Sequence, residues 1–105
     1  MDKQEFSNLA DACLERVTAW LETFDPDEVD YDSADGVVTL EFSDGQKYVL
    51  NRQTAASQMW FAAGAQAWHF DLEDGGWRCP KDGADLYLRI AEAVSEKLGR
   101  PVQVQ

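Results

Sequence analysis

The spacing of apolar residues changes twice along this chain, and that change constrains the fold more than any other feature. Residues 4–24 repeat apolar positions at helical spacing, residues 29–79 alternate apolar with polar positions, and residues 84–98 return to helical spacing. Gly-containing segments divide the alternating part into short strands, which is typical of an antiparallel meander. Two amphipathic helices that bracket one sheet bury their apolar stripes most simply side by side on one sheet face.

We therefore predict an α+β fold, a two-layer α-β sandwich with two helices packed on one face of a single antiparallel sheet of five or six strands. The length of 105 residues corresponds to a single domain over residues 1–105. A hydrophobic content of 45% supplies enough apolar surface for a folded core and argues against disorder.

Local signals place the ends of these elements. Asp25-Pro26 ends the first helix, because proline lacks the N–H that a continuing helix would use. Either Asp82 or Asp85 caps the second helix, and Gly99 stops it. The segment 43–46, which contains an Asp-Gly pair, joins two alternating runs and predicts a tight primed turn with positive φ at both central residues.

Acidic residues outnumber basic ones by 20 to 9, which gives a formal net charge of −11. Such a chain repels phosphate backbones and anionic lipid, so we expect no nucleic-acid partner and no membrane partner. The longest nearly apolar run, residues 59–65, is too short to span a bilayer, and the N-terminus shows no leader pattern. We expect a soluble, cytoplasmic protein in which Cys13 fills the core and neither Cys13 nor Cys79 needs to be paired.

The negative charge is concentrated in the first third of the chain. Residues 1–35 carry eleven acids against two basic residues, a net charge of −9, which leaves −2 for the remaining seventy. Besides Asp2 and Glu5 near the N-terminus, the acids lie on the first helix (Asp11, Glu15 and Glu22) and in the connector and first strand (Asp25, Asp27, Glu28, Asp30, Asp32 and Asp35). A solvated face that keeps the domain soluble is one interpretation.

Clustering of one sign favours a second interpretation, in which a cation binds. Neighbouring like charges destabilise a fold by a few tenths of a kcal/mol per pair, so their concentration calls for a compensating function. Oxygen ligands alone suit hard ions such as Mg, Ca, Mn or iron, because the His and Cys ligands that favour zinc or copper are absent from this stretch. We expect weak, partly hydrated ion sites.

A second surface is predicted on the sheet face that the helices leave bare. Strand alternation directs either Trp60 or its neighbours Met59 and Phe61 outward, and a core tryptophan is the default. Both helices lie on the opposite face, however, so an outward Trp60 with polar neighbours would be a typical interface anchor. His69 stands alone and is interpreted as a structural or rim residue.

The order of short motifs resembles the frataxin family, in its short bacterial form. The matching pieces are Glu5-Phe6 with Leu9-Ala10-Asp11, the acidic stretch, the Asp-Gly hairpin, Asn51-Arg52-Gln53, Gln58 with Trp60, His69-Phe70-Asp71-Leu72, and Trp77. Each piece is short, but the ordered set covers nearly the whole chain. The chain departs from the family pattern at Ala19, where a further acid would extend the acidic stripe of the first helix, and at Pro26, which stiffens the connector.

The resemblance implies an iron-binding regulator of iron-sulfur cluster assembly. It implies ferrous or ferric iron, weakly bound, with other divalent cations accepted, and docking on a cysteine desulfurase that supplies sulfur to a scaffold protein. Mapped onto this sequence, the metal ligands are Asp11, Glu15, Glu22, Asp25, Asp27, Glu28, Asp30 and Asp32, and the partner contacts, all on the bare sheet face, are Asn51, Arg52, Gln53 and Trp60. It also implies a monomer that can oligomerise with iron.

No catalytic machinery is visible in the sequence. We find no nucleophile and base pair and no glycine-rich phosphate loop, so we expect no enzyme, and any ferroxidase activity would be a weak property of an iron-loaded carboxylate surface. An alternative function, from a different class, is an acidic module that binds a basic partner groove with no role for metal. Salt separates the two, because a contact made of charge alone is lost at high ionic strength, whereas an aromatic anchor is not.

Overall fold

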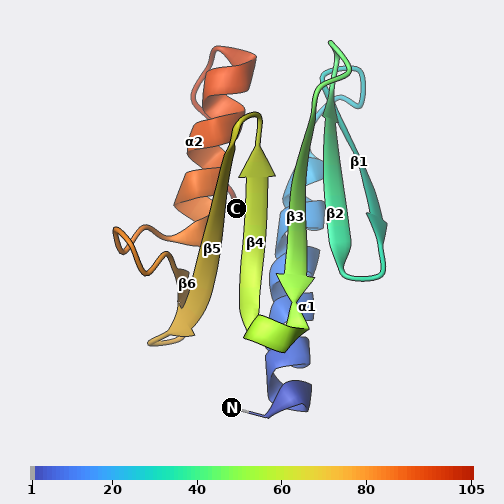
Figure 1. The fold of residues 1–105 in the computed structure, drawn as a ribbon. Helices are drawn as coiled ribbons and strands as arrows, with labels where there is room; N and C mark the ends of the chain where they lie inside the picture. The colour runs from blue at the N-terminus through green and yellow to red at the C-terminus, as the bar shows by residue number, and fades with distance from the viewer. Residues whose placement is uncertain (1) are drawn as a thin grey trace.

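The computed structural model describes residues 2–105, which form a six-stranded antiparallel sheet with both helices on one face (Figure 1). The strands pair in the order in which they follow one another in the chain. This arrangement confirms the predicted α+β sandwich. The elements are α1 (Lys3–Leu21), β1 (Val29–Ala34), β2 (Val37–Phe42), β3 (Lys47–Gln53), the 3-10 turn η1 (Thr54–Ala56), β4 (Gln58–Ala63), β5 (Gln66–Glu73), β6 (Gly76–Arg78) and α2 (Leu86–Leu98).

The core fills the space between the sheet and the helices. Within residues 2–105 no polar or charged residue is buried. The largest fully buried side chains include Phe6 of α1, Phe61 of β4 and Phe70 of β5, which come from both layers. Cys13 lies among them, as predicted, and its burial raises the pKa of the thiol to about 11. It therefore serves as a packing residue with little thiolate at neutral pH.

Both helices have side-chain caps at their N-termini. The carboxylate of Asp2 accepts the N–H of Glu5 at 2.7 Å, and Asp85 does the same for the N–H of Leu88 at 3.1 Å. Of the two candidates for the second cap, Asp85 is therefore the one used. Gly99 follows α2 with φ of 73°, the left-handed conformation that the predicted stop requires.

The primed turns lie elsewhere than predicted. Asp44 is not among the positive-φ residues, and only Gly45 is left-handed, so the expectation of a primed turn at 43–46 is wrong. The N–H of Gly45 bonds to the carbonyl of Phe42, which makes this link a longer loop closed by a left-handed glycine. Both residues have positive φ in two other Asp-Gly pairs, 35–36 and 74–75, which join β1 to β2 and β5 to β6.

The C-terminal tail returns to the helices. The N–H of Val102 donates to Ser95 Oγ at 2.9 Å, and Arg16 Nε donates to the carbonyl of Gln105 at 3.0 Å. Val102 and Val104 pack against the core. The tail thus connects α2 with α1. No helix of residues 2–105 is long and apolar enough to cross a membrane.

Candidate functional site

The predicted metal ligands form an acidic ridge, defined as Asp11, Glu15, Glu22, Asp25, Asp27, Glu28, Asp30 and Asp32. All except the half-buried Glu28 are exposed. The ridge starts on α1, passes through the connector and ends on β1, the strand at one edge of the sheet. Its position follows from the amphipathic pattern of α1, whose apolar stripe faces the sheet and leaves the acids in water.

On the helix, one ridge carboxylate is already paired. Asp11 accepts a hydrogen bond from Arg52 Nη1, which reaches it from β3. No local pattern predicts this pair, because the two residues lie 41 positions apart. Asp11 is therefore partly neutralised, and a cation that binds there has to compete with a guanidinium.

Two ridge carboxylates make hydrogen bonds that hold the end of α1 against β1 and shape the connector. The hydroxyl of Tyr31 on β1 donates to Glu22 Oε1, and this hydrogen bond to the carboxylate raises the pKa of Tyr31. Asp25 Oδ1 accepts the N–H of Asp27 at 2.9 Å, which shapes the connector turn. These two carboxylates therefore have structural as well as electrostatic roles.

A second arginine reaches the ridge from the other end of the chain. Arg100 Nη2 donates to Glu28 Oε1 across 72 residues, and its guanidinium lies 5.8 Å from the ring centre of Phe24. The connector acids have no basic neighbour in sequence, so only the fold reveals this contact. Residues 2–105 contain no group of three His, Cys, Asp or Glu side chains arranged to hold a metal ion. A cation on the ridge would therefore be bound by one or two carboxylates, with water as its remaining ligands.

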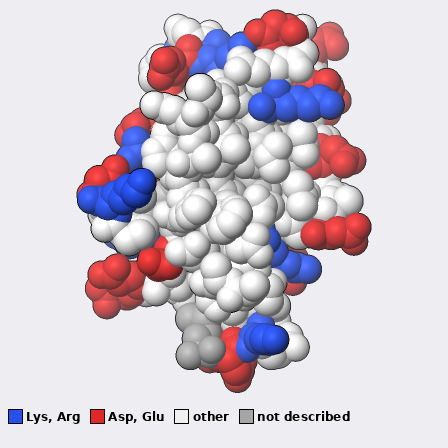
Figure 2. Space-filling model, in the orientation of Figure 1, with Lys and Arg blue, Asp and Glu red and all other residues white. Residues whose placement is uncertain are grey.

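The last ridge residues turn onto the sheet. Asp30 and Asp32 alternate with the buried Val29 and lie on the face of the sheet turned away from the helices, which we name the outer sheet face. Across this face Asp30 lies opposite Glu41, which in turn lies opposite Lys47. Figure 2 shows the middle of this face free of charge and the charged side chains along its margins.

Trp60 occupies the middle of the outer sheet face. Met59 and Phe61 are buried, so alternation directs the half-buried Trp60 outward. Its indole stacks on the imidazole of His69 with ring centres 4.2 Å apart and planes inclined by 9°. The stack is a direct consequence of register, because Trp60 and His69 are cross-strand partners in β4 and β5.

Hydrogen bonds hold the indole in place from one side. Trp60 Nε1 donates to Gln58 Oε1 at 2.9 Å, and Gln58 Nε2 donates to Asp71 Oδ1 at 2.9 Å. Asn51 lies opposite Trp60 on β3. The result is a preorganised flat aromatic surface, ringed by amide side chains, which can pack against a partner at little entropic cost.

The expectation that Asn51, Arg52, Gln53 and Trp60 share one face is wrong for Arg52. Alternation in β3 directs Arg52 to the helix side, in line with the buried Tyr48 and Leu50. Its guanidinium covers Gly36, where an added Cβ would lie 2.7 Å from Arg52 Nε. The structure thus brings Asn51, Gln53 and Trp60 together and couples Arg52 to the ridge instead.

The model of the frataxin-like domain matches residues 1–100. The chain belongs to the frataxin family. This family is known for iron binding and for iron-sulfur assembly.

Solved frataxins agree with this assignment. Frataxin from Psychromonas ingrahamii superposes with a TM-score of 0.90 at 28% identity, covering 100% of this chain and 99% of that one. A trimeric frataxin from the yeast Saccharomyces cerevisiae, solved in complex with ferrous iron, superposes with a TM-score of 0.76 at 30% identity, covering 88% of this chain and 87% of the yeast chain.

Proposed function

We propose that this frataxin is an iron-binding regulator of iron-sulfur cluster assembly in the cytoplasm. It binds iron weakly along the acidic ridge, docks on the cysteine desulfurase and modulates sulfur delivery to the scaffold protein. Family membership and a related yeast structure with ferrous iron support the iron-related part. The proposal includes no catalytic group, so any ferroxidase activity would arise from iron held on the carboxylates.

One observation carries the docking part: the ridge and the aromatic anchor share a surface. Asp32 and Trp60 both lie on the outer sheet face, on strands that are three steps apart in the sheet. With neighbouring strands spaced about 4.8 Å apart, strands β1 and β4 lie roughly 14 Å from each other across the sheet. A single partner of ordinary interface size can therefore contact both.

The iron sites can be tested by titrating ferrous iron into isotope-labelled protein under anaerobic conditions. We expect NMR signals from the end of α1, the connector and β1 to broaden, because hard iron ions prefer carboxylate oxygen. His69 and Cys79 should remain unaffected. The affinity should be about micromolar or weaker, since few protein ligands and retained water hold the ion. Nanomolar binding through His69 would overturn the site.

The desulfurase can be tested directly by a kinetic binding assay with purified enzyme, with and without iron. We expect binding to the desulfurase to be retained at moderate salt concentration, because the contact made by Trp60 is not screened by salt. We also expect the rate of sulfur delivery to the scaffold to change when this protein is present. No binding to the desulfurase at micromolar concentrations would contradict the proposal.

A second candidate function, an acidic module without a metal role, has one observation in its favour. Two of the eight ridge acids, Asp11 and Glu28, are paired with arginines, and no three-ligand group occurs in residues 2–105. For this candidate we expect binding to a basic partner groove whose affinity is the same with and without iron and is lost at high salt.

Sedimentation with and without iron further tests our expectation of a monomer that oligomerises on iron binding.

A further inference from the structure

Strand β5 is paired on one side along only part of its length. Its residues from Gln66 to Asp71 pair with β4, but β6 covers only the segment from Asp71 to Glu73. The half of β5 from Gln66 to Phe70 therefore forms an open edge of the sheet. This edge lies on the side opposite β1 and its acidic ridge.

A proline explains why the pairing stops. Continuing the register from the Asp71 and Arg78 pair would bring Pro80 opposite His69. That position requires an N–H bonded to the carbonyl of His69, and proline has none. The chain instead turns away after Arg78, and the N–H of Cys79 bonds to the carbonyl of Ala84 at 2.9 Å.

The open edge presents unused backbone groups. Along a strand, backbone groups alternate between its two neighbours, so the N–H and C=O groups of Ala67 and His69 point to the side that β6 leaves free. Within residues 2–105 no backbone hydrogen bond joins them to the segment that follows β6. Two donors and two acceptors in extended conformation form a template for another strand.

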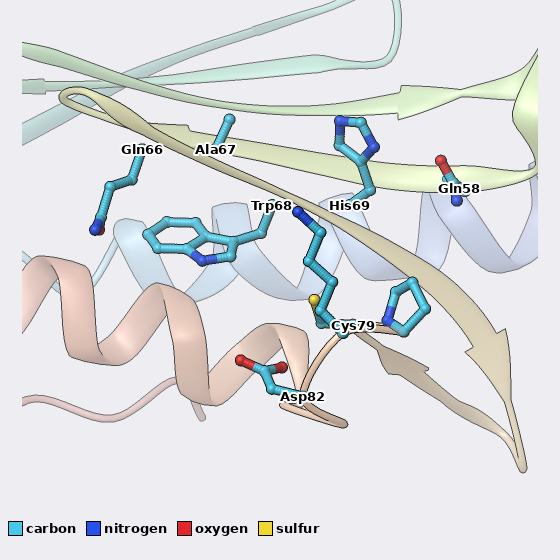
Figure 3. A pocket seen from close by; sticks show the side chains of 9 residues that line it. Gln58, Gln66, Ala67, Trp68, His69, Cys79 and Asp82 are labelled. Carbon is cyan, nitrogen blue, oxygen red and sulfur yellow. The ribbon is translucent and has the colours of Figure 1, made fainter.

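A cavity lies beside this edge (Figure 3). Its volume is about 430 Å³, which is within the range of ligand pockets. Figure 3 shows Trp68 on one side of the β5 ribbon and His69 with Ala67 on the other, while Cys79 and Asp82 come from the segment after β6. The space between β5 and that segment is therefore a groove with a strand template on one wall.

The groove is bordered by positive charge in an otherwise acidic protein. Lys81 lines it and Arg78 precedes it, and neither has a carboxylate within 4.0 Å among residues 2–105. The carboxylate on its wall, Asp82, is paired with Arg89 Nη2 at 2.8 Å. An entering acidic group would therefore meet Lys81 and Arg78, neither bridged to a carboxylate, and the already paired Asp82, while Asp71, opposite Arg78, accepts a hydrogen bond from Gln58.

We propose that the open edge of β5, residues 66–70, binds an extended acidic peptide segment of a partner protein. The segment adds a strand to the sheet through the backbone groups of Ala67 and His69, and its acidic side chains lie beside Lys81 and Arg78. Strand addition supplies affinity through the main chain, while the side chains supply preference. A second copy of this chain is a poorer occupant, because two molecules of net charge −11 repel each other.

Peptide binding can be measured with a labelled, capped hexapeptide of alternating valine and glutamate. Fluorescence polarisation should show saturable binding, and NMR should show shifts and added hydrogen-exchange protection at the Ala67 and His69 amides. The same peptide with lysine in place of glutamate should bind about fivefold more weakly or worse. A glutamate peptide N-methylated at alternate amides should not bind. Equal binding of all three peptides, or no binding at millimolar concentration, would overturn the proposal.

Two variants and a matched control locate the site. Lys81→Glu should lower the affinity for the glutamate peptide about fivefold. Lys47→Glu, the same charge change on β3, should leave that affinity unchanged. Ala67→Pro removes a donor that points to the open edge and spares the bonds to β4, so it should abolish binding. If Ala67→Pro fails to fold, the N-methylated peptide decides the question. Sedimentation could instead show that the parent protein forms a dimer and that Ala67→Pro does not. That result, with no peptide binding to the parent protein, would assign the edge to a second copy of this chain and overturn the proposal of a peptide partner.

Discussion

The acidic ridge and the centre of the outer sheet face differ in how their side chains are held. Ridge carboxylates are exposed except for the half-buried Glu28, and their ion-pair partners, Arg52 and Arg100, come from distant parts of the chain. Trp60, by contrast, is stacked on His69 and bonded to Gln58 by residues of its own and the neighbouring strand. The ridge is thus adaptable, whereas the aromatic surface is preorganised.

If both surfaces meet the proposed partner, they should control different steps of binding. Exposed charge acts over about 10 Å at moderate salt and mainly sets the association rate. A desolvated aromatic acts only on contact and mainly sets the dissociation rate. The two regions should therefore respond differently to substitution, to salt and to cations.

The largest expected effect concerns Trp60. Trp60→Ala should cost about 2 kcal/mol or more of desulfurase binding, as interface hot spots do, mainly through faster dissociation. The melting temperature should fall by only a few degrees, because the indole lies outside the core. The neighbouring Phe61→Ala is the matched control: it empties a core position and should cost about 3–5 kcal/mol of folding stability. Thermal melts and binding kinetics on both variants check this, and equal unfolding would place Trp60 in the core.

The next effect concerns the ridge. Replacing Glu22, Asp25 and Asp30 by their amides keeps shape and acceptor atoms while removing three negative charges. In low salt this variant should melt a few degrees higher, since like charges cost a few tenths of a kcal/mol per pair, and should bind iron more weakly. Association with the desulfurase should slow about tenfold, and added salt should erase that difference. A lower melting temperature for the variant would show that the ridge stabilises the fold.

A smaller effect should follow from freeing a ridge carboxylate. Arg100→Ala releases Glu28, and exposed ion pairs are worth about 0.2–1 kcal/mol, so cation affinity at the connector should rise about two- to fivefold. Iron titration by NMR measures this change at the signals of Glu28 and Val29. Lys47→Ala removes one positive charge without touching Glu28 and serves as the control. Equal gains in both variants would mean that only net charge matters.

The smallest effect concerns a reference ion pair outside both regions. The hydrogen bond from Lys97 Nζ lowers the pKa of Asp44, with help from the N–H of Gln46. A carboxylate with a lowered folded pKa contributes stability above its unfolded pKa of about 4, and that stability is lost as the pH falls through the folded value. Asp44→Asn should therefore melt slightly lower at pH 7 and lose less stability between pH 5 and 2. Thermal melts of both proteins between pH 7 and pH 2 test the direction of this change in stability.

The fold was predictable because periodicity reports burial. The change from helical to alternating spacing predicted both helices and the sheet, and the two cap candidates, Asp82 and Asp85, together with the stop Gly99 predicted the limits of α2 to within a few residues. Turn type was less accessible, since the three Asp-Gly pairs that link consecutive strands look alike in sequence. Strand register decides which of them spans two residues, at 35–36 and 74–75, and which closes a longer loop, at 44–45.

The sites were only partly predictable, because long-range pairs leave no local signal. Alternation left either Trp60 or its neighbours outward, and the polar residues around Trp60 with both helices on the opposite face favoured Trp60; alternation applied from Leu50 would have directed Arg52 inward. The pairs of Asp11 with Arg52 and of Glu28 with Arg100 join residues 41 and 72 positions apart, which only the packed structure brings together. The open edge of β5 likewise depends on where β6 stops.

The contact between the tail and α1 has a consequence for how the molecule is made. Arg16 and the carbonyl of Gln105 are 89 positions apart, so at a synthesis rate of about 5–20 residues per second the arginine precedes its partner by roughly 4 to 18 seconds. Helix α1 and the strands can assemble on the ribosome during that interval, but α2 and the tail arrive last. The two-layer body therefore closes only after α2 and the tail have been synthesised, and until then the growing chain carries an apolar sheet surface that α2 does not yet cover.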